Sequence, residues 1–79
     1  LEPKVRERLI VEMGIDPAIS KTEISDNTSI VVIGFDHETN KIYVLENLAG
    51  KWDFNETVSN IRALAERYRP SRITIEQAA

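Results

Sequence analysis

The feature that most constrains the fold of this 79-residue chain is a change in the spacing of its apolar residues. Three runs have the alternating or near-continuous apolar pattern of β-strands. A longer segment then repeats apolar residues every three or four positions, as an amphipathic helix does, and a last short run returns to alternation. The predicted elements are strands at 9–15, 28–35, 41–48 and 72–76, and a helix between residue 53 or 55 and residue 69. The order is therefore β-β-β-α-β.

The predicted helix has a defined start, a defined end and one apolar stripe. The stripe consists of Val58, Ile61, Leu64, Ala65 and Tyr68. Asp53 and Glu56 have the spacing of a capping box, and Pro70 ends the helix. Trp52 and Phe54 flank the start of the helix, where packing onto it is favoured over stacking on nucleic-acid bases.

The strand runs differ in which of their faces they are expected to bury. In the first run, one apolar face is predicted to lie in the core and the other, interrupted by Glu12, to be partly exposed. The core face consists of Leu9, Val11, Met13 and Ile15. The run 28–35 is almost continuously β-branched, which is typical of a strand buried on both faces. In the third run, Ile42, Val44 and Glu46 are expected on the face opposite Tyr43 and Leu45. Residues 1–8 are polar and are expected to be an irregular lead-in.

The element order also predicts a topology. The first three strands can form an antiparallel meander joined by a turn at 36–40. The helix is then a crossover that returns the last strand parallel to a neighbour. If that neighbour is the first strand, Asp16 and Glu76 both lie at the carboxyl edge of adjacent parallel strands, where open α/β sheets place their sites. Paired carboxylates there suit a hard divalent cation.

Composition narrows the classes of protein further. An apolar fraction of 42% with 29% charged residues indicates a folded chain rather than a disordered one. The net charge of −3 argues against a dedicated nucleic-acid-binding module, and no apolar run is long enough to span a membrane. The absence of cysteine excludes disulfides and thiolate metal sites and fits a cytoplasmic protein.

His37, in the predicted turn, is given no ligand role. A cluster of arginines near the last strand is expected to be a solvated helix face rather than a phosphate-binding patch. This cluster consists of Arg62, Arg67, Arg69 and Arg72.

Seven short segments carry a resemblance to a known family. They are 14–18 (Gly-Ile-Asp-Pro-Ala), Asp26, 30–34, 42–45, 50–54, 68–70 and 73–76 (Ile-Thr-Ile-Glu). In this order and spacing, residues 9–79 resemble the N-terminal half of the nuclease domain of phage terminase large subunits. The resemblance implies a ribonuclease-H-like half-domain of α/β class, with a mixed sheet and one crossover helix. It also implies a metal-dependent DNA endonuclease of phage or prophage origin that acts in the host cytoplasm during DNA packaging.

The resemblance assigns roles to individual residues. Asp16 corresponds to the family's first catalytic aspartate and Glu76 to its second acid, and both would bind Mg²⁺ or Mn²⁺. Asp26 is assigned as an outer-shell residue only. The family's third acid lies after the fourth strand, so the chain is expected to be a truncated domain that ends before it.

Three alternatives remain open at this stage. A Holliday-junction resolvase shares the fold and has similar Gly-Ile-Asp-Pro and Ile-Glu-Gln segments. A second alternative is a non-catalytic remnant that acts as an interaction module, and a third is a proteolytic fragment of a longer protein. Because the fourth strand would be an exposed edge, we also expect a homo-oligomer formed through that strand or through the helix face.

Overall fold

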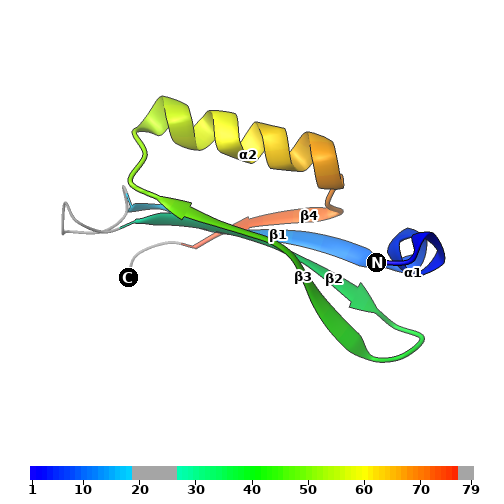
Figure 1. The fold of residues 1–79 in the computed structure, drawn as a ribbon. Coiled ribbons are helices and arrows are strands. Elements are labelled where there is room, and N and C mark those ends of the chain that lie inside the picture. The colour runs from blue at the N-terminus through cyan, green and yellow to red at the C-terminus, as the bar shows by residue number, and fades with distance from the viewer. Residues whose placement is uncertain (19–26, 77–79) are drawn as a thin grey trace.

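A computed structural model describes residues 1–18 and 27–76 of the chain (Figure 1). The described residues form one mixed sheet and two helices. The elements are α1 (Pro3–Arg8), β1 (Ile10–Asp16), β2 (Thr28–Asp36), β3 (Lys41–Gly50), α2 (Phe54–Tyr68) and β4 (Arg72–Ile75). The predicted order of strands and crossover helix is confirmed, and each predicted boundary lies within two residues of the observed one.

The sheet has the strand order β3-β2-β1-β4. β1 pairs antiparallel with β2, and β2 pairs antiparallel with β3. β4 pairs parallel with β1. The meander and the parallel return of the last strand beside the first are therefore as predicted. The long helix α2 makes that return possible, because parallel neighbours need a crossover rather than a tight turn.

The hydrophobic core lies between α2 and one face of the sheet (Figure 1). Every second residue of β1 points into it, as the alternation predicts. The buried apolar residues are Leu9, Val11, Met13, Ile15, Ile30, Val32 and Leu64. Leu64 comes from the predicted helical stripe, and the other stripe residues Ile61, Ala65 and Tyr68 pack around this cluster.

The opposite face of the sheet is open, and here the expectation for residues 28–35 is wrong. α2 covers one face only (Figure 1). On the other face Val31 of β2 is 37% exposed, and Ile33 and Phe35 are only partly buried. A near-continuous β-branched run supplies two apolar faces, but among the described residues only one of them has a covering layer. We call the uncovered side of the sheet the open face.

A bulge in β3 overturns the expected alternation of that strand. Val32 pairs with Glu46 and Ile33 pairs with Val44, so Leu45 is an extra residue in the ladder. Because a bulge shifts the register by one residue, Glu46 returns to the face that α2 covers instead of sharing the face of Val44. There the Glu46 carboxylate accepts a hydrogen bond from the Tyr68 hydroxyl at 2.8 Å.

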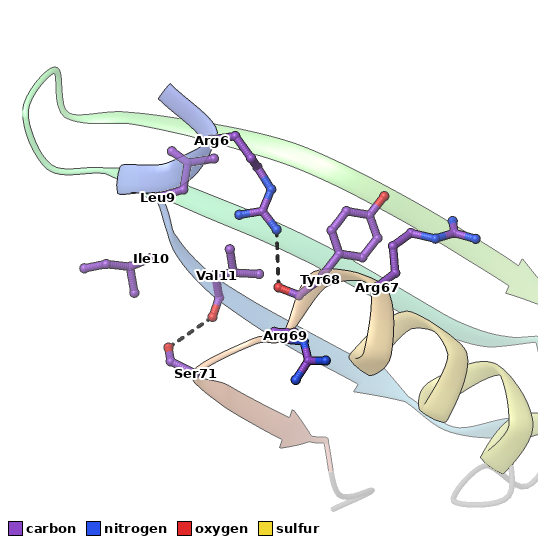
Figure 2. Close-up of a pocket in the computed structure, with 8 residues that line it drawn as sticks. All are labelled: Arg6, Leu9, Ile10, Val11, Arg67, Tyr68, Arg69 and Ser71. Carbon is purple, nitrogen blue, oxygen red and sulfur yellow. Dashed lines mark hydrogen bonds between the residues drawn. The ribbon is translucent and has the colours of Figure 1, made fainter. Parts of the chain in front are cut away.

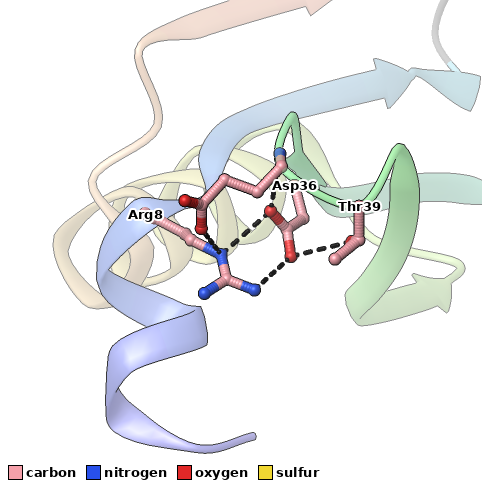
Figure 3. Close-up of polar contacts among 4 residues, drawn as sticks. Arg8, Asp36 and Thr39 are labelled. Carbon is pink, nitrogen blue, oxygen red and sulfur yellow. Dashed lines mark hydrogen bonds and ion pairs between the residues drawn. The ribbon is translucent and has the colours of Figure 1, made fainter.

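The first eight residues contain a helix, contrary to the expected irregular lead-in. α1 has proline at its first position, where a missing N–H costs nothing. Contacts that are distant in sequence stabilise it. The Arg8 guanidinium binds the fully buried Asp36 carboxylate at the end of β2, with Nε–Oδ1 at 2.9 Å and Nη2–Oδ2 at 2.8 Å (Figure 3). Arg6 Nη2 donates to the Tyr68 carbonyl at 3.3 Å.

The predicted capping box of α2 is confirmed. The Asp53 carboxylate accepts from the Glu56 N–H at 2.7 Å, and the Asp53 N–H donates to Glu56 Oε1 at 3.2 Å. Arg69 ends the helix in the left-handed conformation, with φ of 47°, immediately before Pro70. Both ends of the crossover are thus fixed by local chemistry, which sets where β4 begins.

Candidate metal site

Asp16 and Glu76 lie side by side at the carboxyl ends of β1 and β4. The parallel register pairs Ile15 with Ile75, so the next position of each strand brings the two acids together. The Glu76 N–H donates to the Ile15 carbonyl at 2.9 Å, which extends the ladder to that position. The neighbouring placement expected from the element order is therefore present.

The chain leaves β1 immediately after Asp16. Pro17 is buried and cannot donate to a ladder, which ends the strand. The Ala18 N–H then donates to the hydroxyl of Thr28 at 2.9 Å, and Thr28 is 1% exposed. This partly buried contact ties the end of β1 to the start of β2 and so restricts the position of Asp16.

Both acids line one pocket of about 210 Å³. The pocket lies on the open face, and its remaining lining residues are Gly14, Ile15, Ser29, Val31 and Thr74. Asp16 is half-buried and Glu76 is exposed, so the pocket is open to solvent. Ser29 and Thr74 were not among the site residues predicted from the sequence. Strand alternation could have identified them, because each takes the same face of its strand as Asp16 and Glu76.

The charge pattern along this face changes from one ladder position to the next. Four residues before the acids, Glu12 faces Arg72, and Arg72 Nη2 lies 2.9 Å from Glu12 Oε2. Gly14 and Thr74 follow. Asp16 and Glu76 then place two carboxylates opposite each other. Like charges directly opposite each other on a sheet are unfavourable.

The chemistry of the pocket suits a hard cation. Its polar side chains are two carboxylates and two hydroxyl groups, which offer only oxygen ligands, and Mg²⁺ and Mn²⁺ prefer oxygen ligands. Within residues 1–18 and 27–76, no group of three or more histidine, cysteine, aspartate or glutamate side chains is arranged to hold a metal ion. Asp26, the expected outer-shell residue, lies outside the described residues.

A larger pocket of about 510 Å³ lies at the other end of β1, between α1 and the end of α2 (Figure 2). Arg6, Arg67 and Arg69 line it, but their guanidinium groups do not converge (Figure 2). Arg6 stacks over the Tyr68 ring at 5.9 Å, and Arg67 pairs with Glu46 at 3.4 Å. These contacts occupy two of the three cations, so the pocket lacks the converging free cations of an anion site.

The other residues considered from sequence behave as solvated or packed groups. The four clustered arginines are exposed: Arg62, Arg67, Arg69 and Arg72. His37 is exposed in the hairpin turn. Trp52 packs against the core, whereas Phe54 is 62% exposed. The Asp16–Glu76 pocket is therefore the best-supported site on this part of the chain.

Comparison with known proteins adds no assignment. No family model, curated protein or solved structure matches this chain. Within the described residues, neither helix has the length and apolar character needed to cross a membrane.

Proposed function

We propose that this chain carries part of the metal site of a divalent-metal-dependent DNA endonuclease with ribonuclease-H-like ancestry. The observation that supports the proposal best is the like-charged pair of Asp16 and Glu76 at the carboxyl ends of adjacent parallel strands. Its position agrees with the roles that the terminase resemblance gives these two acids. DNA as the substrate, Mg²⁺ or Mn²⁺ as the cofactor and a cytoplasmic setting belong to the same proposal.

Asp16 and Glu76 would hold the metal ion through their carboxylate oxygens. When bound, such an ion activates water and stabilises charge that develops on a phosphoryl group. The half-buried Asp16 is fixed by the Pro17 turn and the Thr28 contact, so it is the better-positioned ligand. The exposed Glu76 can adjust its side chain toward the ion. Two carboxylates hold Mg²⁺ only loosely, because the ion keeps several of its waters.

A plasmid-nicking assay with Mn²⁺ tests the proposal. We expect slow nicking by the purified chain and its loss in Asp16→Asn and Glu76→Gln. Glu66→Gln is the matched control, because Glu66 is an exposed acid on α2 and lies outside the pocket. Equal nicking by all four proteins, or nicking that persists with EDTA, would contradict the proposal. A synthetic four-way junction tested in parallel separates resolvase activity from activity on linear duplex DNA.

The open face supports a second candidate function, that of a non-catalytic interaction module. Four of its apolar side chains are substantially exposed, and exposed apolar patches mark interaction surfaces. They are Ile10 at 46%, Val31 at 37%, and Ile42 and Val44 at 66% each. Complete absence of metal-dependent nicking in the assay above, with metal binding also absent, would favour this candidate over the nuclease.

A further inference from the structure

Among the described strands, β4 lies at an edge of the sheet, and its apolar side chains on the α2 face are exposed to solvent. It lies at the end of the strand order, with β1 as its single neighbour among the described strands. On the face that carries α2, Ile73 is 44% exposed and Ile75 is 59% exposed. An apolar groove of about 270 Å³ runs between Ile75 and the start of α2, where Phe54 also lies exposed. An edge strand of this kind is a template for pairing with another chain.

The backbone groups available for pairing can be identified from the ladder. The Glu76 N–H points to β1, where it donates to Ile15. Along a strand, successive residues turn their N–H and C=O groups to opposite sides. Thr74 therefore shares the direction of Glu76, and the backbone groups of Ile73 and Ile75 point to the open edge.

The sequence of this edge is self-complementary. Residues 72–76 are Arg-Ile-Thr-Ile-Glu, which has apolar, polar and charged residues placed symmetrically about Thr74. We propose that two copies of the chain associate by antiparallel pairing of β4 about a two-fold axis at Thr74. In this register Arg72 of each copy faces Glu76 of the other copy. Likewise, Ile73 of each copy faces Ile75 of the other copy. The proposal concerns assembly and does not depend on nuclease activity.

The proposed register suits both the direction of the backbone groups and the pairing of the side chains. Ile73 and Ile75 of the second copy become a hydrogen-bonded pair, which uses the groups that point outward. The four isoleucines form one apolar strip on the α2 face, continuous with the groove beside Ile75. On the open face, opposite charges meet at both ends, a favourable cross-strand pairing. Moving the axis to Ile73 would place Arg72 against Thr74 and leave Glu76 without a cationic partner.

The pairing is compatible with the contacts already present. Arg72 binds Glu12 of its own chain through Nη2. A guanidinium has five N–H donors, so Arg72 can bind a second carboxylate at the same time. Because β4 is only four residues long, the interface is small, and we expect a Kd on the order of 10 μM to 1 mM.

Sedimentation equilibrium over that concentration range, with charge-reversal variants, tests the proposal. Arg72→Glu and Glu76→Arg each place like charges opposite each other and should weaken association about tenfold or more. The double variant restores opposite charges and should recover association. Arg62→Glu, the same change at an exposed site on α2, is the control and should associate like the wild type. A wild-type chain that remains monomeric, or association that single reversals leave unchanged, overturns the proposal.

A cross-link tests the register itself. The chain has no cysteine, so a single Thr74→Cys substitution introduces the only thiol. In the proposed register, Thr74 and Thr74 of the second copy form a non-hydrogen-bonded pair with Cα atoms about 4.5 Å apart, within disulfide reach. We expect rapid oxidation to a disulfide dimer. Ser59→Cys, an exposed position on α2, should oxidise slowly. Equal rates for the two variants would contradict the register.

Discussion

Arg8 and Asp36 form a bidentate ion pair that joins the N-terminal helix to the β2–β3 hairpin (Figure 3). The Asp36 side chain is fully buried, whereas the Arg8 side chain is 32% exposed. Asp36 also accepts hydrogen bonds from the Glu38 N–H at 3.1 Å and the Thr39 hydroxyl at 2.9 Å. One carboxylate thus organises the end of β2, the turn and α1 at once.

Replacing this carboxylate should destabilise the fold. Asp36→Asn keeps the shape but removes the charge and one acceptor, so a donor to this buried position loses its partner. We expect the melting temperature to fall on the order of 5 °C or more. Glu38→Gln is the matched control, because Glu38 also pairs with Arg8 at 2.8 Å but is 60% exposed. If circular dichroism showed an equal fall in the melting temperature for both variants, the burial of Asp36 would make no difference to stability.

The same pair predicts how stability depends on pH. The hydrogen bond from Arg8 holds the pKa of the Asp36 carboxyl well below its usual range. The unfolded chain takes up this proton first, near a pKa of about 3.9, so the stabilisation is complete above that pH and is lost as pH falls below it. Urea unfolding between neutral pH and pH 2 should show a steeper acid loss for the wild type than for Asp36→Asn. Parallel pH profiles would contradict the assignment.

The hydroxyl of Tyr68 should titrate at a higher pH than that of an ordinary tyrosine. Its hydroxyl donates to Glu46, and that hydrogen bond raises the pKa of Tyr68. The difference in absorbance at alkaline pH between the wild type and Tyr68→Phe isolates this residue, and its midpoint should lie above about 10. Because the folded-state pKa is raised, the contact stabilises the protein below pH 10, and that contribution is lost as pH rises further. Glu46→Gln should lower the midpoint; an unchanged midpoint would exclude the hydrogen bond as its cause.

Gly50 should resist substitution because of the indole of Trp52. A Cβ at position 50 would meet Trp52 Cε2 at 2.8 Å, and the ring packs on the core. Gly50→Ala should therefore displace the ring, shift its fluorescence and cost about 1–3 kcal/mol. Trp52 is the only tryptophan, so the emission reports on it alone. Gly14→Ala is the control, since its Cβ would meet Val31 at an ordinary 3.5 Å. Identical emission from both variants would contradict this packing.

Features set by local chemistry or by chain topology could be predicted from the sequence. The capping box of Asp53 and Glu56 depends on residues three positions apart, and its geometry is nearly autonomous. The adjacency of Asp16 and Glu76 followed from the order of the elements, because the crossover helix returns β4 beside β1. The metal-binding role of this pair stays a prediction.

Features that depend on contacts distant in sequence could not be predicted in this way. α1 is six polar-rich residues long, too short to form a helix by propensity, and it is stabilised by Arg8 and Asp36, which are 28 residues apart. The bulge at Leu45 leaves no recognisable signal in the sequence, yet it moves Glu46 to the other face of the sheet. The pattern of 28–35 encodes two apolar faces but not which layer covers each of them. The structure of these elements depends on the distant segments of the same chain that they contact.

In the proposed site, Asp16 and Glu76 bind a divalent cation together. The most direct measurement is a Mn²⁺ titration followed by the amide signals of the ¹⁵N-labelled chain. We predict paramagnetic broadening confined to the ends of β1 and β4, including Gly14, Asp16 and Thr74, that is displaced by Mg²⁺ and lost in Asp16→Asn. Broadening spread evenly over the exposed acids, or the same local broadening in Asp16→Asn, would contradict the claim.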